Sequence, residues 1–129
     1  MGPVIGRLHS IVVDCPDPRE LATFYEHLLG LTRVEDTADW VTLTGPDGPA
    51  LAFQRVDRYV APSWPSPDPP QQLHVDVLVD DLDEAEPKVL SLGAELLEGS
   101  DKPIGFRVYA DPAGHPFCLV TPESIAAPG

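Results

Sequence analysis

The chain has 129 residues, which is enough for one ordinary domain. Hydrophobic residues make up 43% and charged residues 22%, a globular composition that excludes a disordered chain. The formal net charge of −13 repels nucleic-acid phosphates and anionic membrane surfaces, so we expect neither nucleic acid nor membrane as a partner.

The sequence also bears on the cellular compartment. No stretch approaches the roughly 20 apolar residues of a membrane helix, and the first residues carry no secretory signal. The two cysteines, Cys15 and Cys118, are too few for a disulfide framework and lack zinc-motif spacing. We therefore expect a cytoplasmic protein with reduced thiols.

The first half of the chain predicts one helix and four strands. The helix lies between Asp17, a suitable N-cap, and Gly30, a suitable stop, with apolar residues at helical spacing. β-Branched and apolar runs predict strands at residues 8–14, 31–35, 40–44 and 50–56.

The second half repeats this order. Strands are predicted at 73–79, 95–98, 105–110 and 116–120, with a helix opened by residues 80–83. Pro87 is unexpected inside that helix, because proline removes a donor and clashes with the preceding turn. It indicates either a distorted first turn or a later helix start.

This repetition predicts an α+β fold of two tandem βαβββ modules. We expect residues 1–129 to form a single domain. Module one spans about 7–60, an extended Pro-rich linker about 61–72, and module two about 73–122. Each short sheet needs cover on both faces, so the two sheets are expected to enclose a cup-shaped space.

Strand alternation selects candidate site residues. His9 shares a face with Ile11 and Val13, and His74 shares one with Asp76, so polar groups at the strand starts are expected inside the cup.

Aromatic and cationic side chains are further candidates. Trp40 and Trp64 offer aromatic surface, with Trp64 suited to a lid or a subunit contact. Phe53 and Phe106 are expected in the core, with lining of a pocket for a flat or apolar ligand as the alternative. Arg107 is a candidate for an anionic ligand group, and the full candidate set is His9, Trp40, Gln54, Trp64, His74, Asp76, Arg107 and Cys118.

Three segments resemble a known family. They are His9–Val13, Leu21–Leu31 and Asp111–Phe117, and they are similar to the glyoxalase/bleomycin-resistance/dioxygenase family, also called the vicinal oxygen chelate superfamily. The resemblance spans about Arg7 to Thr121. It implies the paired βαβββ fold and, commonly, a homodimer. The family includes lyases, dioxygenases, epimerases, thiol transferases and metal-free antibiotic-binding proteins, so fold alone does not fix the function.

The resemblance also implies positions for a metal site. Metal-using members carry a histidine in each module's first strand, matched here by His9 and His74, and an acid in each module's last strand. Ala52 and Cys118 occupy those two acid positions. Gln54 lies two residues beyond Ala52, so His9, His74 and Gln54 form the candidate metal set, with Cys118 and Asp76 as further donors. Zinc, nickel, manganese or iron are the ions considered, and these donors suit zinc better than magnesium or manganese.

Three hypotheses follow. The first is a protein that binds a small organic molecule in the cup between its modules, with the usual metal chemistry absent or altered. The alternative is a metal-dependent lyase, isomerase or dioxygenase that uses His9, His74 and Gln54. The third is an interaction module whose cup is filled by its own side chains. Without a metal, the histidines are structural residues that hydrogen-bond to Gln54 or Asp76, or one of them binds the ligand directly or acts as a general base.

Overall fold

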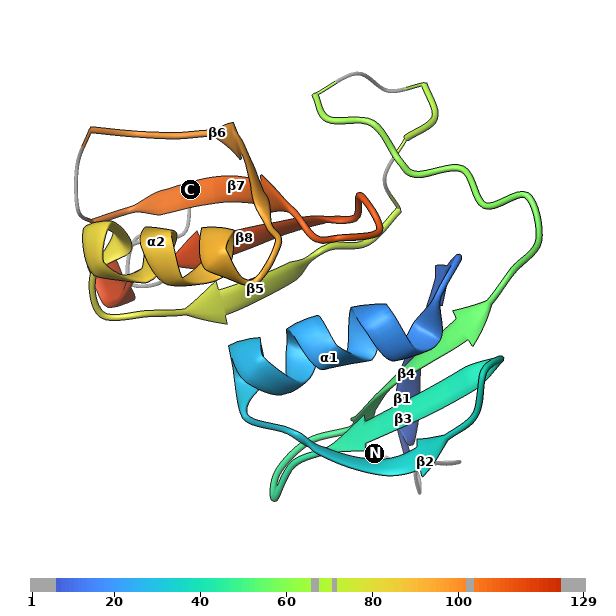
Figure 1. Ribbon diagram of the computed structural model, residues 1–129. Helices are drawn as coiled ribbons and strands as arrows, with labels where there is room; N and C mark the ends of the chain where they lie inside the picture. Colours follow the sequence, from blue (N-terminus) through green and yellow to red (C-terminus); the bar gives the residue numbers. More distant parts are fainter. Residues whose placement is uncertain (1–6, 66–67, 71, 102–103, 124–129) are drawn as a thin grey trace, which may run out of the picture. The chain divides into compact units, whose positions relative to one another are not determined.

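The computed structural model describes residues 7–65, 68–70, 72–101 and 104–123. The chain forms two compact units, divided between Tyr59 and Val60 (Figure 1). The first unit contains β1 (Ser10–Cys15), α1 (Pro18–Leu29), β2 (Thr32–Asp36), β3 (Trp40–Thr44) and β4 (Ala50–Arg55). The second contains β5 (Val75–Leu78), α2 (Leu82–Ser91), β6 (Glu95–Glu98), β7 (Phe106–Ala110) and β8 (Pro116–Val120). The predicted α+β fold of two βαβββ modules is confirmed.

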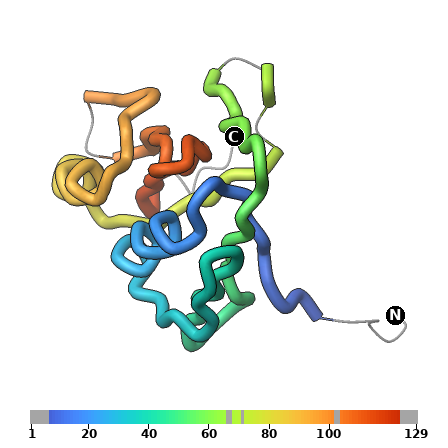
Figure 2. The backbone as a smooth tube through the Cα atoms, turned by 45° about the vertical axis from the view of Figure 1, so that its right-hand side comes forward, coloured from blue at the N-terminus to red at the C-terminus, as the bar shows by residue number. Residues whose placement is uncertain are grey.

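Each unit builds one four-stranded sheet in the same way. The strand orders are β1-β4-β3-β2 and β5-β8-β7-β6. In both sheets the first strand pairs in parallel with the last, and the other pairs are antiparallel. The tube in Figure 2 shows each helix beside the strands of its own unit.

The helix α1 covers one face of the first sheet. Its N-cap Asp17 accepts a hydrogen bond from the Glu20 backbone N–H, and Gly30 ends it in the left-handed conformation at φ 66°. The Tyr25 ring stacks on that of Phe53 with centroids 5.5 Å apart. Because side chains alternate along a strand, Ala52 and Gln54 point to the face opposite α1.

The helix α2 is held differently. Asp81 caps it by accepting from the Glu84 backbone N–H at 3.0 Å, and Leu82 and Val89 are its buried residues. Pro87 lies within the helix, so the helix neither starts later nor confines proline to its first turn. Arg107 and Tyr109 reach α2 from β7 through hydrogen bonds, described below.

The Pro-rich segment between the units does not run straight. The Ser63 backbone N–H donates to the Pro69 carbonyl at 2.8 Å, and the Ser63 hydroxyl donates to that of Asp68 at 3.1 Å. These bonds draw the two sides of the segment together, so the prediction of an extended linker was wrong for this stretch. Residues 66–67 and 71 of the predicted linker lie outside the described part.

No helix in the described part of the chain is both long and apolar enough to cross a membrane.

Candidate functional site

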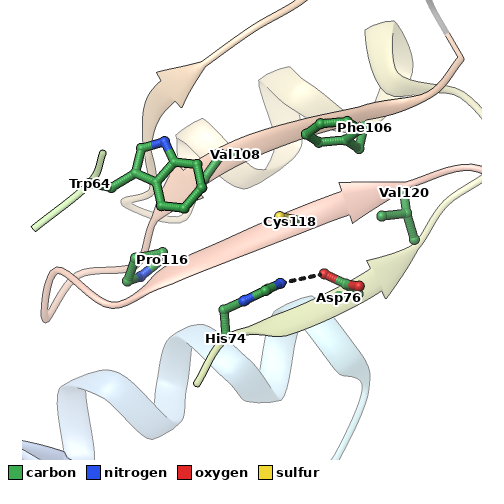
Figure 3. A pocket seen from close by; sticks show the side chains of 8 residues that line it. All are labelled: Trp64, His74, Asp76, Phe106, Val108, Pro116, Cys118 and Val120. Atoms are coloured by element: carbon green, nitrogen blue, oxygen red, sulfur yellow. Dashed lines mark ion pairs between the residues drawn. The ribbon is translucent and has the colours of Figure 1, made fainter. Parts of the chain in front are cut away.

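A pocket of about 300 Å³ lies on the face of the second sheet that points away from α2. All the residues that line it belong to the second unit: Trp64, His74, Asp76, Phe106, Val108, Pro116, Cys118 and Val120 (Figure 3). Its volume is at the lower end of the range for small-molecule sites.

Strand register explains why these side chains meet. Asp76 pairs with Cys118, and Cys118 pairs with Val108, so the three form one row across β5, β8 and β7. Phe106 pairs with Val120 in a parallel row. Paired residues in a sheet point to the same face, and residues two apart along a strand do so as well. The strand residues of the pocket therefore all lie on one face of the sheet.

Trp64 adds a wall that does not come from a strand. It lies in the segment before β5, and Figure 3 shows its indole ring beside Val108 and Pro116. The indole nitrogen Nε1 is buried and has no hydrogen-bond partner among the described residues. Buried indole N–H groups usually have a partner, so a ligand acceptor is one group that this nitrogen could bind.

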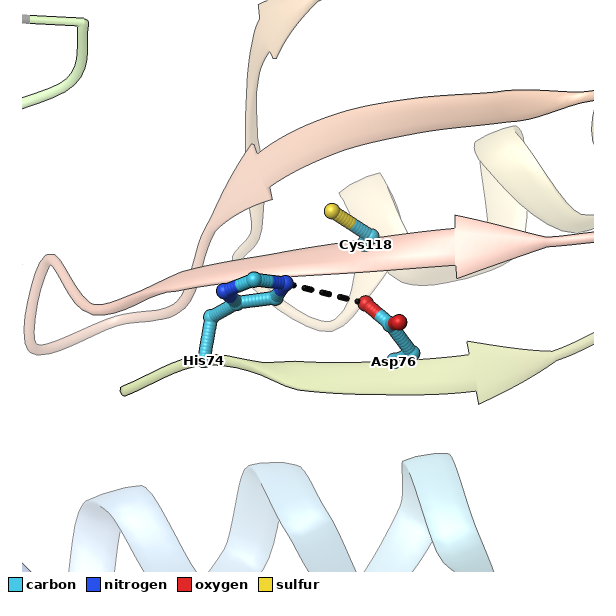
Figure 4. A group of neighbouring side chains, drawn as sticks. All are labelled: His74, Asp76 and Cys118. Atoms are coloured by element: carbon cyan, nitrogen blue, oxygen red, sulfur yellow. Dashed lines mark ion pairs between the residues drawn. The ribbon is translucent and has the colours of Figure 1, made fainter. Parts of the chain in front are cut away.

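The pocket contains one polar cluster. His74 Nε2 lies 3.2 Å from Asp76 Oδ1, and the side chains of these residues are 40% and 57% exposed. The Cys118 sulfur completes the group, and the three ligand atoms lie within 4.8 Å of one another (Figure 4). An imidazole, a carboxylate and a thiol can together bind a metal ion, or accept and donate hydrogen bonds to an organic ligand.

The electrostatic environment keeps the thiol protonated. Burial, together with the negative charges of Asp76 and then Glu98, raises the pKa of Cys118 to about 11. Glu98 shares the Cys118 face, because it pairs with Val108 on the other side of β7. A reactive thiol needs a lowered pKa, so metal-free Cys118 is not suited to act as a nucleophile at neutral pH.

Arg107 does not line the pocket, and its predicted role with an anionic ligand group was wrong. It is 3% exposed and points toward α2. Its guanidinium donates to the Leu82 carbonyl at 3.3 Å and to Asp83 at 2.7 Å, and it lies 3.3 Å from Glu86. The alternation that places Phe106 and Val108 in the pocket places Arg107 on the helix side.

His9 is also not equivalent to His74, contrary to the prediction. Ser10 pairs with Ala50, which lies two residues after the turn glycine Gly48. His74 precedes the pair Val75–Phe117, so its position corresponds to Pro116, two residues after Gly114. The first-unit equivalent of His74 is therefore Ser10. The chain has one more residue between His9 and its helix cap than between His74 and its own cap, and this spacing could have revealed the shift.

The register likewise separates Gln54 from His9. Gln54 pairs with Asp14 at the far end of β1, which places it about 16 Å from His9 along the sheet at the usual strand rise. His9 and Gln54 therefore cannot share a metal ion within the first sheet, and the prediction that they lie side by side was wrong. His9 is exposed and immediately precedes β1.

Trp40 lies beside Gln54 on the first sheet, on the face opposite α1. Its indole N–H donates to the Thr42 hydroxyl at 2.8 Å, which donates in turn to Glu35 at 2.7 Å. Neither Trp40 nor Gln54 lines the pocket of the second unit.

Four predicted site residues, Trp64, His74, Asp76 and Cys118, do meet in one pocket. For Phe106 the sequence favoured core packing over pocket lining, and that preference was wrong. Phe106 is 52% exposed and lines the pocket, whereas Phe53 is fully buried as predicted. The sequence shows only that Phe106 and Arg107 lie on opposite faces of the strand, not which face the helix covers.

Comparison with known proteins places the chain in a family. The family described as a Glyoxalase-like domain matches residues 10–120, and no curated protein matches. A glyoxalase/bleomycin resistance protein/dioxygenase family enzyme from Burkholderia phytofirmans PsJN has a similar structure. It is 14% identical at a TM-score of 0.70, and the match covers 90% of this chain and 98% of that one.

Two other solved structures carry more specific descriptions. A lactoylglutathione lyase from Agrobacterium tumefaciens is 18% identical with a TM-score of 0.60, covering 92% of this chain and 96% of that one. TnmS3, an antibiotic binding protein from Streptomyces sp. CB03234, is 21% identical with a TM-score of 0.58, covering 94% and 99%. These likenesses support the fold, and the family match over residues 10–120 shows that the chain belongs to the glyoxalase-like domain family of the vicinal oxygen chelate superfamily.

Proposed function

We propose that this protein binds a small organic molecule in the pocket of its second sheet. One observation carries the proposal: apolar walls from Trp64, Phe106 and Val108 surround a compact polar cluster. Binding sites for small molecules combine such walls with a few converging polar groups, which fix the orientation of the ligand.

The charges in the pocket indicate the chemistry of the ligand. The described lining residues include the Asp76 carboxylate and contain no lysine or arginine. The chain as a whole carries a net charge of −13. A flat apolar ligand that presents a cationic or hydrogen-bond-donating group to Asp76 suits this site, whereas an anionic ligand does not. The antibiotic-binding structural relative is consistent with a ligand of this general kind.

The test is a thermal-shift screen of aromatic small molecules, including cationic antibiotics, followed by calorimetric titration of the hits. Trp64→Ala and Phe106→Ala should weaken binding of a hit by about tenfold each, because each removes a large contact surface. The surface variant His27→Ala is the matched control and should leave the affinity unchanged. Hits whose affinity is indifferent to both pocket variants would contradict the proposal.

The sequence predicted a cup built between both modules, and this finer arrangement can be tested with the same hits. Trp40→Phe changes an aromatic side chain of the first sheet while Trp64 remains. Weaker binding by this variant would support a ligand shared by the two modules. Unchanged affinity would restrict the ligand to the second unit.

A metal-dependent lyase, isomerase or dioxygenase is the second candidate, supported by the His74, Asp76 and Cys118 cluster. The originally predicted ligands do not fit, because strand register separates Gln54 from His9. The second-sheet cluster does offer suitable donors. A bound divalent ion would polarise ligand oxygens, while Asp76 and His74 would orient the ligand within the pocket.

The cytoplasmic location and the homodimer remain parts of this proposal. The cytoplasmic location follows from the low number of cysteines, which favours reduced thiols. The homodimer follows from the family resemblance. Light scattering on the purified chain would give the oligomeric state directly.

A further inference from the structure

We propose that Gly114 is a positioning residue for the pocket: residues 60–65, here called the strap, lie against it through Ala61, and this contact holds the Trp64 ring over the second sheet. The inference goes beyond the proposed function, because it concerns how the pocket acquires its wall. Only its consequence for binding rests on that function.

The strap passes Gly114 at very short range. A Cβ added to Gly114 would lie 2.7 Å from the Ala61 Cβ and 4.0 Å from the Ala61 Cα. Non-bonded carbon atoms prefer a separation of about 3.5–4.0 Å, so a side chain at position 114 would force the two segments apart by about 1 Å. Glycine is therefore the residue that allows the observed approach.

The turn between β7 and β8 is the fixed side of this contact. The buried Asp111 carboxylate accepts hydrogen bonds from the backbone N–H groups of Ala113 at 2.9 Å and His115 at 3.0 Å. The Gly114 N–H donates to the Asp111 carbonyl at 2.8 Å, and the Asp111 N–H donates to the His115 carbonyl at 2.9 Å. Because these bonds hold the turn in one shape, a clash at Gly114 is relieved by movement of the strap.

The strap transmits the position of Ala61 to Trp64, three residues later. Two prolines within the strap restrict its φ angles. Next to Trp64, the Ser63 N–H donates to the Pro69 carbonyl at 2.8 Å, and the Ser63 hydroxyl donates to the Asp68 carbonyl at 3.1 Å. These two bonds fix the shape of the segment but not its distance from the sheet. The contact with Gly114 supplies that distance, because the turn that carries Gly114 joins two strands of the sheet.

The ring that is held in this way covers the middle of the sheet. Figure 3 shows the Trp64 indole beside Val108 and Pro116. Val108 is only 1% exposed, although it lies on the face that points away from α2. A displaced ring would uncover Val108 and change the surface that a ligand contacts. Gly114, which does not line the pocket, therefore determines one of its walls.

The first unit contains the matched comparison. Gly48 lies in the equivalent turn, between β3 and β4, with φ at 83°, and φ is 90° at Gly114. A Cβ at Gly48 would meet nothing within 4 Å among the described residues. Alanine would thus strain the backbone of both turns alike, but only at position 114 would it strike another segment.

The experiment follows Trp64 fluorescence in the full chain carrying Trp40→Phe, which leaves Trp64 as the single tryptophan. Gly114→Ala should shift the emission to longer wavelength and increase quenching by acrylamide, both toward the values of the unfolded chain, because the ring leaves an apolar contact for water. Gly48→Ala is the control and should change neither reading. An unchanged Trp64 signal in Gly114→Ala, or an equal change in Gly48→Ala, would overturn the proposal.

A second substitution separates the contact from strain in the turn. Ala61→Gly, added to Gly114→Ala, removes the atom that the new Cβ strikes. The Trp64 emission should then return to that of the Trp40→Phe parent, although the strain of the positive φ remains. Emission that stays shifted in this double variant would show that the turn affects Trp64 without the contact, and the proposal would fail.

The strap offers a variant for the case in which Gly114→Ala does not fold. Ala61 is exposed, so Ala61→Val enlarges the other side of the contact without disturbing the core. It should produce the same shift in Trp64 emission, and an unchanged emission would contradict the proposal.

These readings need no ligand, so they are independent of the proposed function. Hits of the aromatic screen should lose affinity in Gly114→Ala as they do in Trp64→Ala. A chain whose Trp64 responds as expected but which binds no compound of the screen would support the positioning role of Gly114 and contradict the binding function.

Discussion

The two units have the same strand order, but they fill the space beneath their helices with different chemistry. Under α1, β3 contributes Val41 and Leu43, both fully buried. Under α2, β7 contributes Arg107 and Tyr109 at the corresponding register positions. The Tyr109 hydroxyl donates to Glu86 at 2.8 Å, and Arg107 binds Asp83 and the Leu82 carbonyl. Apolar side chains fill the space beneath α1, and ion pairs join its edge to β2, from Glu26 to Arg33 and from Arg19 to Asp36. Beneath α2 the charged group Arg107 lies within the buried contact itself.

The open face of the second sheet also differs from that of the first. Its central row contains Asp76 and Cys118, where the first unit has Val12 and Ala52. The first sheet has polar groups on its open face too, in the chain from Trp40 through Thr42 to Glu35, so its apolar face is the one beneath α1. The second sheet carries polar groups on both faces, in different roles: beneath α2 they attach the helix, and in the pocket they are available to a ligand.

The largest expected effect tests how α2 is attached. Arg107→Ala should lower the free energy of unfolding by about 3 kcal/mol, because it removes a buried cation and leaves Glu86 and the Leu82 carbonyl without it. Chemical denaturation followed by circular dichroism gives the value. Arg55→Ala is the control, since Arg55 pairs with Asp39 and Asp57 on the surface, where such pairs contribute about 0–1 kcal/mol.

Arg107→Met distinguishes ion pairing from packing at the same position. Methionine retains most of the volume and none of the charge, so we expect it to recover only a minor part of the stability lost in Arg107→Ala. Full recovery would mean that α2, like α1, is held by apolar burial. The contrast between the two units would then fail.

A smaller effect of opposite sign is expected at Pro87. This residue lies inside α2, where it cannot donate a backbone hydrogen bond. Pro87→Ala should therefore raise the free energy of unfolding by about 1–2 kcal/mol, less than the full helix-interior penalty of proline, because alanine also frees the unfolded chain. Thermal denaturation would show this as a higher Tm. A lower Tm would indicate that the proline ring contributes packing that outweighs the missing bond.

The sequence was sufficient to predict most of the fold, because its signals are local. The helix from Pro18 to Leu29 has a cap, an apolar stripe and a terminal glycine, and the structure ends it where these signals do. The repeated order of elements then determined the module architecture. Both β3 and β8 were predicted with the bounds that the structure gives.

The site was only partly predictable, because period-two alternation divides a strand into two faces without showing which face the helix covers. Arg107 was assigned to the ligand for this reason, although its hydrogen bonds are made with α2. His9 was misplaced because a single extra residue before Asp17 changes the register, and a shift of one residue reverses the face. The cluster in the second unit was found in pieces, since only strand pairing shows that Asp76 and Cys118 are partners.

The smallest effect concerns the charge around Cys118 in the metal-free protein. Burial, then Asp76 and then Glu98, raise the pKa of this thiol to about 11, which favours its protonated form. At pH 8 about one thiol in a thousand is then ionised, so alkylation in the presence of a chelator should be slow and should accelerate up to about pH 11.

Asp76→Asn removes the nearer charge and should lower the midpoint of the pH–rate profile, while burial keeps it above the ordinary value. Glu98→Gln should lower the midpoint less, because its carboxylate lies farther away in the register. If the two variants shifted the midpoint equally, the thiol would be responding to the net charge of the whole chain, and the replacement of Val12 and Ala52 in the first sheet by Asp76 and Cys118 in the second would have no local electrostatic effect.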